Sequence, residues 1–285
     1  MNWNDHLFQP NLVAESSGTT LGPEWSGVRF VVTKAGPVHS ERPYGLNLGV
    51  HVGDDAEQVQ TRRQALSSLM GAPIVWLNQV HGTEVFHADE VLPNASVITA
   101  DASVTTSPDV ALAIMTADCL PALFVARNAN GSAVGVGAAH AGWRGLYAGV
   151  LERTVHELAC RTGTTPESIS AFLGPCIGPK SFEVGQEVFD AFVEAHPAQA
   201  ACFEERKGLS NGQPDYTAVT EKKYLGDLPA LARMALQRCG VHRIHQSELD
   251  TFTNLDFFSH RRGQQQGLPA GRFASLIRLL PWLGA

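Results

Sequence analysis

The sequence predicts a mixed α+β fold in one domain, because strand-like and helix-like segments occur together without the strict alternation of a doubly wound sheet. Three short apolar runs are typical of strands: PIVWLNQV before His81, VALAIM before Thr116 and AVGVGAA before His140. Longer segments elsewhere repeat apolar residues at helical spacing. With 285 residues, 44% of them hydrophobic, and no internal repeat, the chain can build one large core.

The other elements can be placed in chain order. Asp55 is an expected N-cap for a helix that stops near Gly71. The first strand returns as TEVFHA and the second as PALFVA. After a surface loop at 207–216, Asp227 begins a helix that stops near Gly240. Apolar residues four positions apart predict two more helices, one with Leu146, Val150, Thr154 and Leu158, the other with Val184, Val188 and Phe192.

Composition argues against several classes of function. The formal net charge of -7 and the isoelectric point of about 5.9 argue against a broad basic surface for nucleic acid or an anionic membrane. Neither a secretory signal nor an apolar run of about 20 residues is evident, so we expect a cytoplasmic protein. The five cysteines form no CxxC pair, and we expect Cys160, Cys202 and Cys239 to pack as reduced, small apolar side chains.

His81, Cys119 and His140 each stand where a predicted strand ends, so side chains from separate strands can meet at one place. Two imidazoles and a thiolate suit zinc, and three protein ligands leave the fourth tetrahedral position open. The separations are wide, and spacing alone identifies no motif. The shared context of the three residues predicts a catalytic metal centre.

The same atoms allow a second chemistry, in which Cys119 is a nucleophile and His140 its base. Asp118 is adjacent in sequence, but neighbours in an extended segment point to opposite sides, so we expect it to stabilise the fold. HAGWRG opens a helix whose N-terminus and Arg144 suit an anion. GPCIGP is a tight loop that brings Cys176 toward the site.

Seven stretches follow one another between about residues 25 and 278. They are PYGLNLGVHVGDD, WLNQVHG, ADAS, MTADCLP, AAHAGWRG, LGPCIGP with SFEVG, and FFSHRRG with AGRFAS. Together they resemble the laccase-domain family, also called the YfiH family of purine nucleoside phosphorylases. Each motif is modest, but the ordered set is specific and covers nearly the whole chain. The resemblance implies a catalytic domain at 25–285 behind an N-terminal segment at 1–24.

The resemblance also implies an α+β fold with a mixed, bifurcated sheet flanked by helices, similar to the catalytic domain of deamidating toxins. It implies a zinc site made by the His of QVHG, the Cys of ADCLP and the His of HAGWRG. Here these are His81, Cys119 and His140, which would be both metal ligands and catalytic residues. Copper is an adventitious alternative, because it leads the affinity order for such ligands.

The family's activities are phosphorolysis of adenosine, inosine, guanosine and methylthioadenosine, and deamination of adenosine. Deamination uses a water whose pKa zinc lowers, whereas phosphorolysis needs a phosphate held below the anomeric carbon. The resemblance therefore implies a purine nucleoside and phosphate as partners. From the net charge we expect no nucleic-acid or membrane partner, and we expect a monomer. Candidate phosphate or ribose groups are Arg144, Arg261, Arg262 and Arg272, and candidate nucleoside contacts are Asn47, His51 and Gln79.

The chain departs from the family pattern near these substrate residues. Lys34, Pro37 and His39 stand in a loop where relatives commonly carry Arg, Gly-Gly and Ser, and lysine lacks the planar fork of arginine. Asp250 and His260 replace a common Cys and Tyr. None of these is an expected zinc ligand, so the differences concern substrate preference.

Three other functions stay open at this point. A copper polyphenol oxidase would need paired His-x-His motifs, and the sequence contains none. An amidase that edits peptidoglycan precursors would attack an amide with Cys119 or an activated water. A nucleoside-binding protein without catalysis is the third. Glu183, in SFEVG, is a candidate acid or base.

Overall fold

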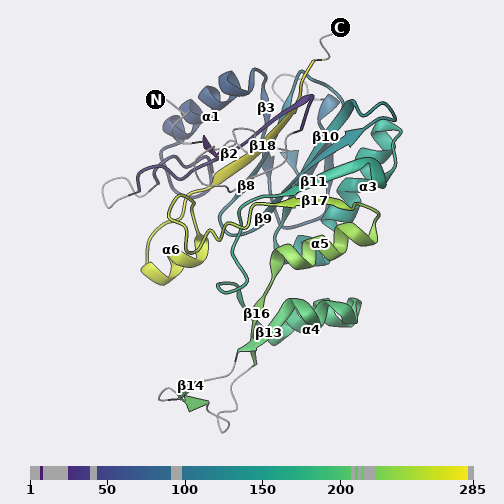
Figure 1. The fold of residues 1–285 in the computed structure, drawn as a ribbon. Coiled ribbons are helices and arrows are strands. Elements are labelled where there is room, and N and C mark those ends of the chain that lie inside the picture. Colours follow the sequence, from purple (N-terminus) through teal and green to yellow (C-terminus); the bar gives the residue numbers. More distant parts are fainter. Residues whose placement is uncertain are drawn as a thin grey trace, which may run out of the picture.

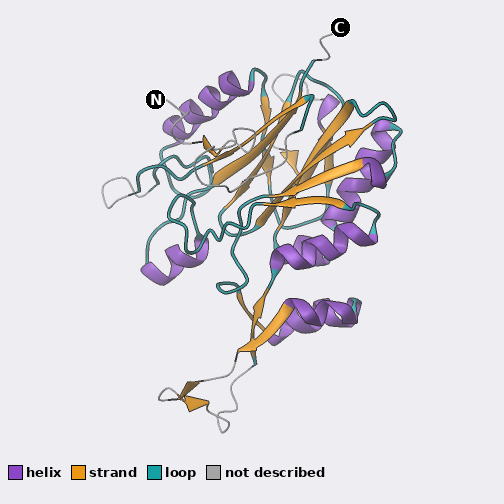
Figure 2. Cartoon of the chain, viewed as in Figure 1, coloured by secondary structure: helices purple, strands orange, loops and turns teal. Residues whose placement is uncertain are grey.

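The computed structural model describes residues 7–8, 25–38, 44–90, 98–206, 209–210, 213–214 and 222–281. Its centre is a pair of β-sheets stacked face to face, with helices on both outer faces (Figure 1, Figure 2). The strands pair both in parallel and antiparallel. The predicted mixed α+β class is confirmed, whereas the segment 1–24 lies outside the described residues except for 7–8.

The first sheet has five strands. Their order is β1 (Leu7–Phe8), β2 (Val28–Thr33), β18 (Phe273–Leu279), β8 (Ala111–Thr116) and β3 (Ile74–Val75). β3 runs parallel to β8, and the other pairs are antiparallel. The helix α1 (Ala56–Met70) covers the outer face of this sheet, where its Leu66 shares a buried cluster with Ala113 and Leu276.

The second sheet has six strands. Their order is β17 (Arg243–Gln246), β11 (Ile169–Leu173), β9 (Leu120–Arg127), β10 (Ala133–Ala141), β7 (Ala102–Thr105) and β5 (Val85–His87). Two helices, α3 (Val150–Thr162) and α5 (Leu228–Arg238), cover its outer face. The turn between β8 and β9 connects the two sheets.

An apolar core fills the space between the sheets. Phe30, Leu112 and Ile277 of the first sheet share a buried cluster with Val125 and Phe172 of the second. One face of β8 and of β9 meets this core, while the other meets the helices. A strand buried on both faces has no reason to alternate polar and apolar residues. This explains why VALAIM and PALFVA are continuous apolar runs.

The predicted helix ends are confirmed in α1 and nearly so in α5. The carboxylate of Asp55 accepts a first-turn N–H bond at 2.8 Å, and Gly71 ends α1 with a φ of 70°. Asp227 caps α5 in the same way. This helix ends at Arg238, two residues before the expected stop at Gly240.

Two other helix predictions are wrong at their N-terminal ends. A separate short helix, α2 (Trp143–Tyr147), precedes α3, because Gly149 between them adopts a φ of 93°. Val184 belongs to a strand, β12 (Glu183–Gly185), and α4 (Gln186–Ala195) begins only after it. Four-residue spacing does not reveal a strand that runs directly into a helix.

A small third sheet projects from the sandwich (Figure 1). It consists of β12, β16 (Lys223–Gly226) and β13 (Phe203–Arg206), with α4 beside it. The predicted loop at 207–216 follows β13. Its described residues, 209–210 and 213–214, pair as a short hairpin.

The remaining elements are short. They are β4 (Leu77–Asn78), β6 (Ile98–Thr99), β14 (Leu209–Ser210), β15 (Gln213–Pro214), α6 (His260–Gln266) and 3-10 helices at Ala88–Glu90, Pro166–Ser168 and Pro197–Cys202. Within the described ranges, no helix has the length and apolar character needed to cross a bilayer.

Phe172 tests the core between the sheets, since it is fully buried and its ring centroid lies 5.5 Å from that of Phe30. We expect Phe172→Ala to lower the free energy of unfolding by about 3–5 kcal/mol, because it removes apolar contacts and leaves a cavity. Denaturant unfolding followed by circular dichroism measures the loss. Val50→Ala, at a position that is 59% exposed, is the control and should change stability by less than about 0.5 kcal/mol. Equal losses in the two variants would contradict this core.

Candidate metal centre and active site

His81, Cys119 and His140 converge in the structure. Their candidate ligand atoms all lie within 4.8 Å of one another, and Cys119 Sγ is 3.7 Å from His81 Nε2. The two imidazole rings meet edge to face with centroids 4.7 Å apart. In the part of the chain that the structure describes, no other group of three His, Cys, Asp or Glu residues is gathered in this way.

Turns place the cysteine and the first histidine. Cys119 ends the turn between β8 and β9, and Asp118 before it has a φ of 93°. His81 follows β4 with a φ of 63°. Residues other than glycine rarely adopt such left-handed conformations, and the residues that do so are concentrated at functional sites. His140 lies inside β10 opposite Pro121, which brings it next to the cysteine turn.

A buried carboxylate, that of Asp101, positions both histidines. Its Oδ1 accepts a hydrogen bond from His140 Nδ1 at 2.8 Å. The backbone N–H groups of Val80, His81 and Gly82 also donate to the carboxylate, at 3.1, 2.9 and 2.6 Å. The bond to Nδ1 leaves Nε2 of His140 as the ligand atom, an arrangement common at metal-binding imidazoles.

The sequence patterns by themselves do not single out Asp101. It stands in ADAS, one of the seven family stretches, just before β7. Ala102 pairs with Ala139 in the adjacent β10, and this register places Asp101 beside His140. The signal available in the sequence is that Asp101 stands directly before a strand. Its link to His140 is visible only from the pairing of β7 with β10.

The thiol and the second imidazole form a charged pair. Burial raises the pKa of Cys119, but His140 and His81 outweigh burial and lower it to about 6. Burial lowers the pKa of His140, but Cys119 and Asp101 outweigh burial and raise it to about 9. Between these pH values the metal-free pair is thiolate and imidazolium. The thiolate is the form of cysteine that binds metals and attacks electrophiles.

Asp118 ties the cysteine turn to the C-terminal part of the chain. Its carboxylate accepts hydrogen bonds from Thr251 Oγ1 at 2.7 Å, Ser259 Oγ at 3.0 Å and the backbone N–H of Arg261 at 2.7 Å. The group that orients His140 is therefore Asp101, while Asp118 holds α6 against the turn.

A cavity of about 160 Å³ opens beside Cys119. Trp143 and Phe182 form aromatic parts of its wall, and Arg261 and Gln264 form polar parts. The Nη2 atom of Arg261 also donates to a backbone carbonyl of β12 at 2.9 Å. Aromatic walls with a few polar groups suit a flat ring that carries hydrogen-bonding atoms.

Two predicted nucleoside contacts, Asn47 and Gln79, hold backbone segments together. Asn47 is fully buried, and its amide donates to Asp54 and to a backbone carbonyl while accepting two backbone N–H groups. Gln79 pairs with both backbone groups of Met115 in β8, at 2.8 and 2.9 Å. The structure thus does not present Asn47 to the cavity, and it uses Gln79 to extend the edge of the first sheet.

The predicted arginines lie in different surroundings. Arg144 is exposed, and its guanidinium lies over the ring of Trp143 at 4.4 Å. Arg262 donates to three backbone carbonyls and so clamps the loop before α6. Of these three arginines, Arg261 lines the cavity beside the cysteine.

Further candidates from the sequence are engaged elsewhere. Lys34 pairs with Asp256 at 2.7 Å, and the carboxylate of Glu183 pairs with Arg206. Burial raises the pKa of Cys176 well above its usual value, so it stays a neutral thiol. His39 lies outside the described residues.

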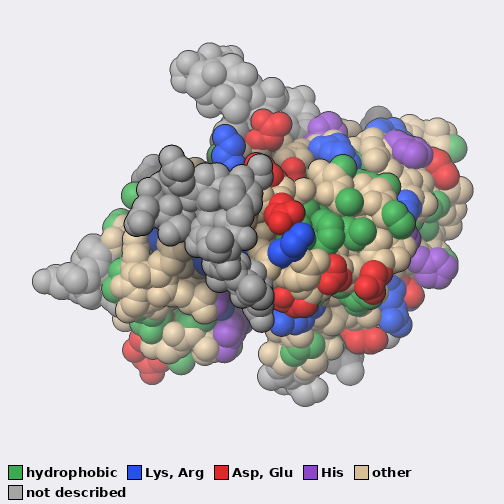
Figure 3. Space-filling model, turned by 90° about the horizontal axis from the view of Figure 1, so that it is seen from below, with side chains coloured by type: hydrophobic (Ala, Val, Ile, Leu, Met, Phe, Trp, Pro, Cys, Tyr) green, Lys and Arg blue, Asp and Glu red, His purple; other side chains and the backbone are tan. Residues whose placement is uncertain are grey.

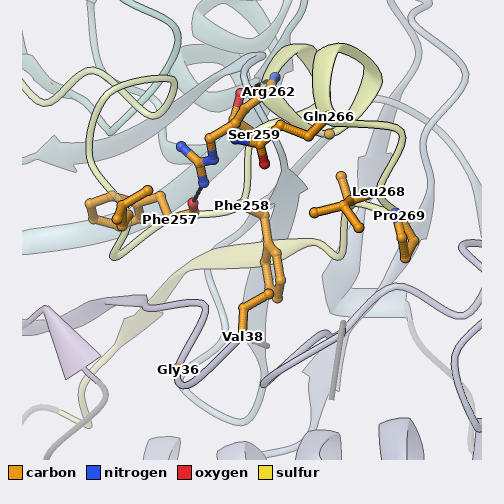
Figure 4. Close-up of a pocket in the computed structure, with 12 residues that line it drawn as sticks. Gly36, Val38, Phe257, Phe258, Ser259, Arg262, Gln266, Leu268 and Pro269 are labelled. Carbon is orange, nitrogen blue, oxygen red and sulfur yellow. Dashed lines mark hydrogen bonds between the residues drawn. The ribbon is translucent and has the colours of Figure 1, made fainter. Parts of the chain in front are cut away.

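A larger cavity, of about 580 Å³, lies on the other face of α6 (Figure 4). Val38, Phe258, Leu268 and Pro269 line it with apolar side chains, and Arg262 reaches its edge. Its described lining contains no histidine, cysteine or carboxylate. The reactive groups are therefore concentrated at the smaller cavity.

The donor set fits a metal ion. Two imidazole nitrogens and a thiolate, one imidazole being held by a carboxylate, are ligands that suit zinc and also copper. A sandwich of two mixed sheets with this group of three possible ligands defines an α+β protein with a candidate metal centre.

Comparison with known proteins places the chain in a family. Residues 28–280 match the family described as multi-copper polyphenol oxidoreductase laccase. The chain is 42% identical over 264 residues to purine nucleoside phosphorylase PA4543 of Pseudomonas aeruginosa, which covers 91% of this chain and 98% of the relative. It is 42% identical over 266 residues to purine nucleoside phosphorylase YfiH of Escherichia coli, which covers 90% and 98%.

Solved structures agree with this placement. Protein NMB0706 of Neisseria meningitidis superimposes with a TM-score of 0.75 at 40% identity, covering 90% of this chain and 96% of that one. A YfiH protein of Bacillus licheniformis gives a TM-score of 0.73 at 27% identity, covering 90% and 94%. The chain therefore belongs to the multi-copper polyphenol oxidoreductase laccase family, and the resemblance read from its motifs is confirmed.

Asp101→Asn should weaken metal binding about 10- to 100-fold, because the amide no longer anchors His140 as an anion does. Competition with a chromophoric chelator measures the affinity. Asp109→Asn, at an exposed position, is the control and should bind metal as the parent chain does. Unchanged affinity in Asp101→Asn would show that the carboxylate does not support the centre.

The charged pair predicts how the cysteine reacts with pH. In metal-free protein, alkylation of Cys119 should be half-maximal near pH 6, since the thiolate exists above the pKa and is lost as the pH falls through it. His140→Ala should move this midpoint up toward the ordinary cysteine value of about 8.5. Mass spectrometry of the peptide that contains Cys119 gives the extent of reaction. A midpoint near 8.5 before the substitution would refute the pair.

Proposed function

We propose that this chain is a zinc-dependent purine nucleoside phosphorylase that also deaminates adenosine. Its nucleosides would include adenosine, inosine, guanosine and methylthioadenosine. The observation that carries the proposal is the position of the His81, Cys119 and His140 group at the edge of a cavity with aromatic walls. The relatives named purine nucleoside phosphorylase support the same activity.

One set of residues would bind the metal, and another would contact the purine base. His81, Cys119 and His140 would hold zinc, with Asp101 keeping His140 in place. When bound, zinc supplies Lewis-acid chemistry at neutral pH. Trp143 lines the cavity together with Phe182, and their apolar faces suit a purine.

Phosphorolysis also requires groups in the cavity that stabilise the departing base. A phosphate oxygen forms a bond to the anomeric carbon as the bond from that carbon to the purine nitrogen breaks. The base leaves with the electron pair and needs a proton or a hydrogen-bond donor. His260 and Gln264 line the cavity with nitrogen-bearing side chains, and we assign this role to them.

A second candidate function is a cysteine hydrolase, including an amidase for peptidoglycan precursors. It is favoured by three side chains of the same site, since Cys119, His140 and Asp101 form a nucleophile, a base and an orienting carboxylate. A copper polyphenol oxidase has less support, because the described residues gather one three-ligand group and the sequence has no His-x-His.

We also propose that the protein acts in the cytoplasm as a monomer on small molecules. All five cysteines are free thiols, as expected in a reducing compartment. On the face drawn in Figure 3, basic and acidic side chains are interspersed. With a net charge of -7, this distribution favours a free nucleoside and phosphate over nucleic acid.

The test combines metal content with product analysis. Protein purified without added metal should contain about one zinc per chain and convert adenosine and phosphate to adenine, with some inosine. Cys119→Ser and His81→Ala should lose zinc and turnover together. Cys160→Ser is a matched control, because Cys160 also lies beside a histidine, 3.6 Å from His156 Nε2, but on the surface of α3.

Other outcomes would change the assignment. Zinc retained in Cys119→Ser with turnover lost would favour the cysteine hydrolase. Stoichiometric copper with phenol oxidation at enzymatic rates, about 1 to 1,000 per second, would restore the oxidase. Adenine with neither inosine nor hypoxanthine would remove the deaminase part of the proposal.

A further inference from the structure

Arg63 and Arg272 are half-buried arginines for which no carboxylate of the described residues lies within ion-pair distance. Arg62 on α1 shows the ordinary arrangement, paired with Asp54 at 2.6 Å. Its neighbour Arg63 donates instead to a backbone carbonyl at 2.9 Å and to Met115 Sδ at 3.4 Å, and lies over the ring of Trp76 at 4.2 Å. These partners are neutral, so the charge of Arg63 is not compensated.

Arg272, just before β18, is the second arginine of this kind. Its Nη1 donates to the carbonyls of Ala270 and Gly271 at 2.8 and 3.0 Å, and its other N–H groups have no hydrogen bond to described residues. A guanidinium offers five N–H donors, so both side chains keep unused ones. Burial lowers the pKa of Arg63 to about 10 and also lowers that of Arg272. The neutral hydrogen-bond partners of the two guanidinium groups do not fully replace the hydration that burial removes.

Both arginines hold the same loop. The Nε of Arg63 donates to the carbonyl of Leu48, and the N–H of Leu48 donates to the backbone carbonyl of Arg272 at 3.0 Å. His51, three residues further along, is exposed at this place. Its pKa is lowered by partial burial and by the charges of Arg272 and Arg63. The side chains of Arg63 and Arg272 therefore lie at the short loop that carries His51.

The metal centre lies next to this group. Phe273 pairs with Thr116 at the end of β8, so Arg272 stands at the same end of the sheet as the turn with Cys119. Alternate residues of β18 face α1, which puts Arg272 on the side where Arg63 lies.

We propose that Arg63, Arg272 and His51 form a phosphate-binding subsite beside the metal centre, and that its ligand is the orthophosphate cosubstrate. Guanidinium groups recognise phosphate oxygens through paired N–H bonds, which matches the unused donors here. The choice of orthophosphate rests on the proposed function, whereas the subsite itself rests on the arginines. Cys119 lines the aromatic cavity, and Arg272 stands at the same end of the first sheet as the turn that carries Cys119, so phosphate and nucleoside would adjoin one centre.

Calorimetric titration of the full-length protein with orthophosphate, in chloride buffer free of sulfate, tests the subsite. Arg63→Gln and Arg272→Gln should each raise the Kd at least about tenfold, since each removes charge-assisted bonds. Arg127→Gln is the matched control. Arg127 also donates to backbone carbonyls, at 2.9 and 3.0 Å, but at the other end of β9 from the cysteine turn, and its substitution should leave the Kd unchanged.

Lysine variants keep the test valid if a glutamine variant is unstable. Arg63→Lys and Arg272→Lys retain the charge but not the fork, so their affinity should fall between that of the parent and the glutamine variants. Thermal unfolding by circular dichroism checks that each variant is folded. A titration with adenosine 5′-monophosphate separates free orthophosphate from the phosphoryl group of a larger ligand.

The outcomes separate the subsite from the proposed function. Orthophosphate that does not bind, or that binds equally to the Arg63→Gln, Arg272→Gln and Arg127→Gln proteins, overturns the subsite. Binding of the nucleotide without orthophosphate also overturns it. Phosphorolysis that persists in both glutamine variants with an unchanged KM for phosphate leaves the function and removes the subsite. Orthophosphate binding that depends on the two arginines, without nucleoside cleavage, would support the subsite and remove the proposed function.

Discussion

The metal centre depends on the buried carboxylate of Asp101. This anion is removed from water and is stabilised by His140 and three consecutive backbone N–H groups. Charged acceptors gain most from such bonds, and a buried charge left without them is costly. One carboxylate binds both the imidazole of His140 in β10 and the turn that carries His81. It therefore fixes the relative positions of two candidate ligands that are far apart in the sequence.

The two stacked sheets give this arrangement its rigidity. Cys119 stands on the turn that leads from one sheet to the other, and Asp118 in that turn adopts a left-handed backbone conformation. Its carboxylate is held by Thr251, Ser259 and the start of α6, which offsets the unfavourable conformation. The ligands are therefore attached to packed strands and anchored turns rather than to free loops, as a reactive centre requires.

Charge is distributed unevenly around the centre. The chain as a whole has a net charge of -7, yet Cys119 lies beside His140, and Arg272 stands at the same end of the first sheet as the cysteine turn. Arg63 and Arg272 are held by neutral atoms, so local positive charge is available to a ligand. An acidic protein can thus keep positive charge close to a reactive centre, because short-range contacts and burial outweigh the distant surface charges.

The sequence alone determined the α+β class, the ends of α1 and most of α5, and the grouping of His81, Cys119 and His140, because caps, apolar runs and ligand chemistry are local properties. It did not determine the pairing of β7 with β10, which places Asp101 at His140, or the crowding of Arg63 against the loop that Arg272 also holds. The same limit applies to Asn47 and Gln79, whose polar amides suit a ligand equally well in the sequence but bind backbone in the structure. Some of these contacts join residues far apart in the sequence, such as Gln79 with Met115, 36 positions away, and Asn47 with Arg272, 225 positions away. Only tertiary packing decides which polar groups are left for a ligand.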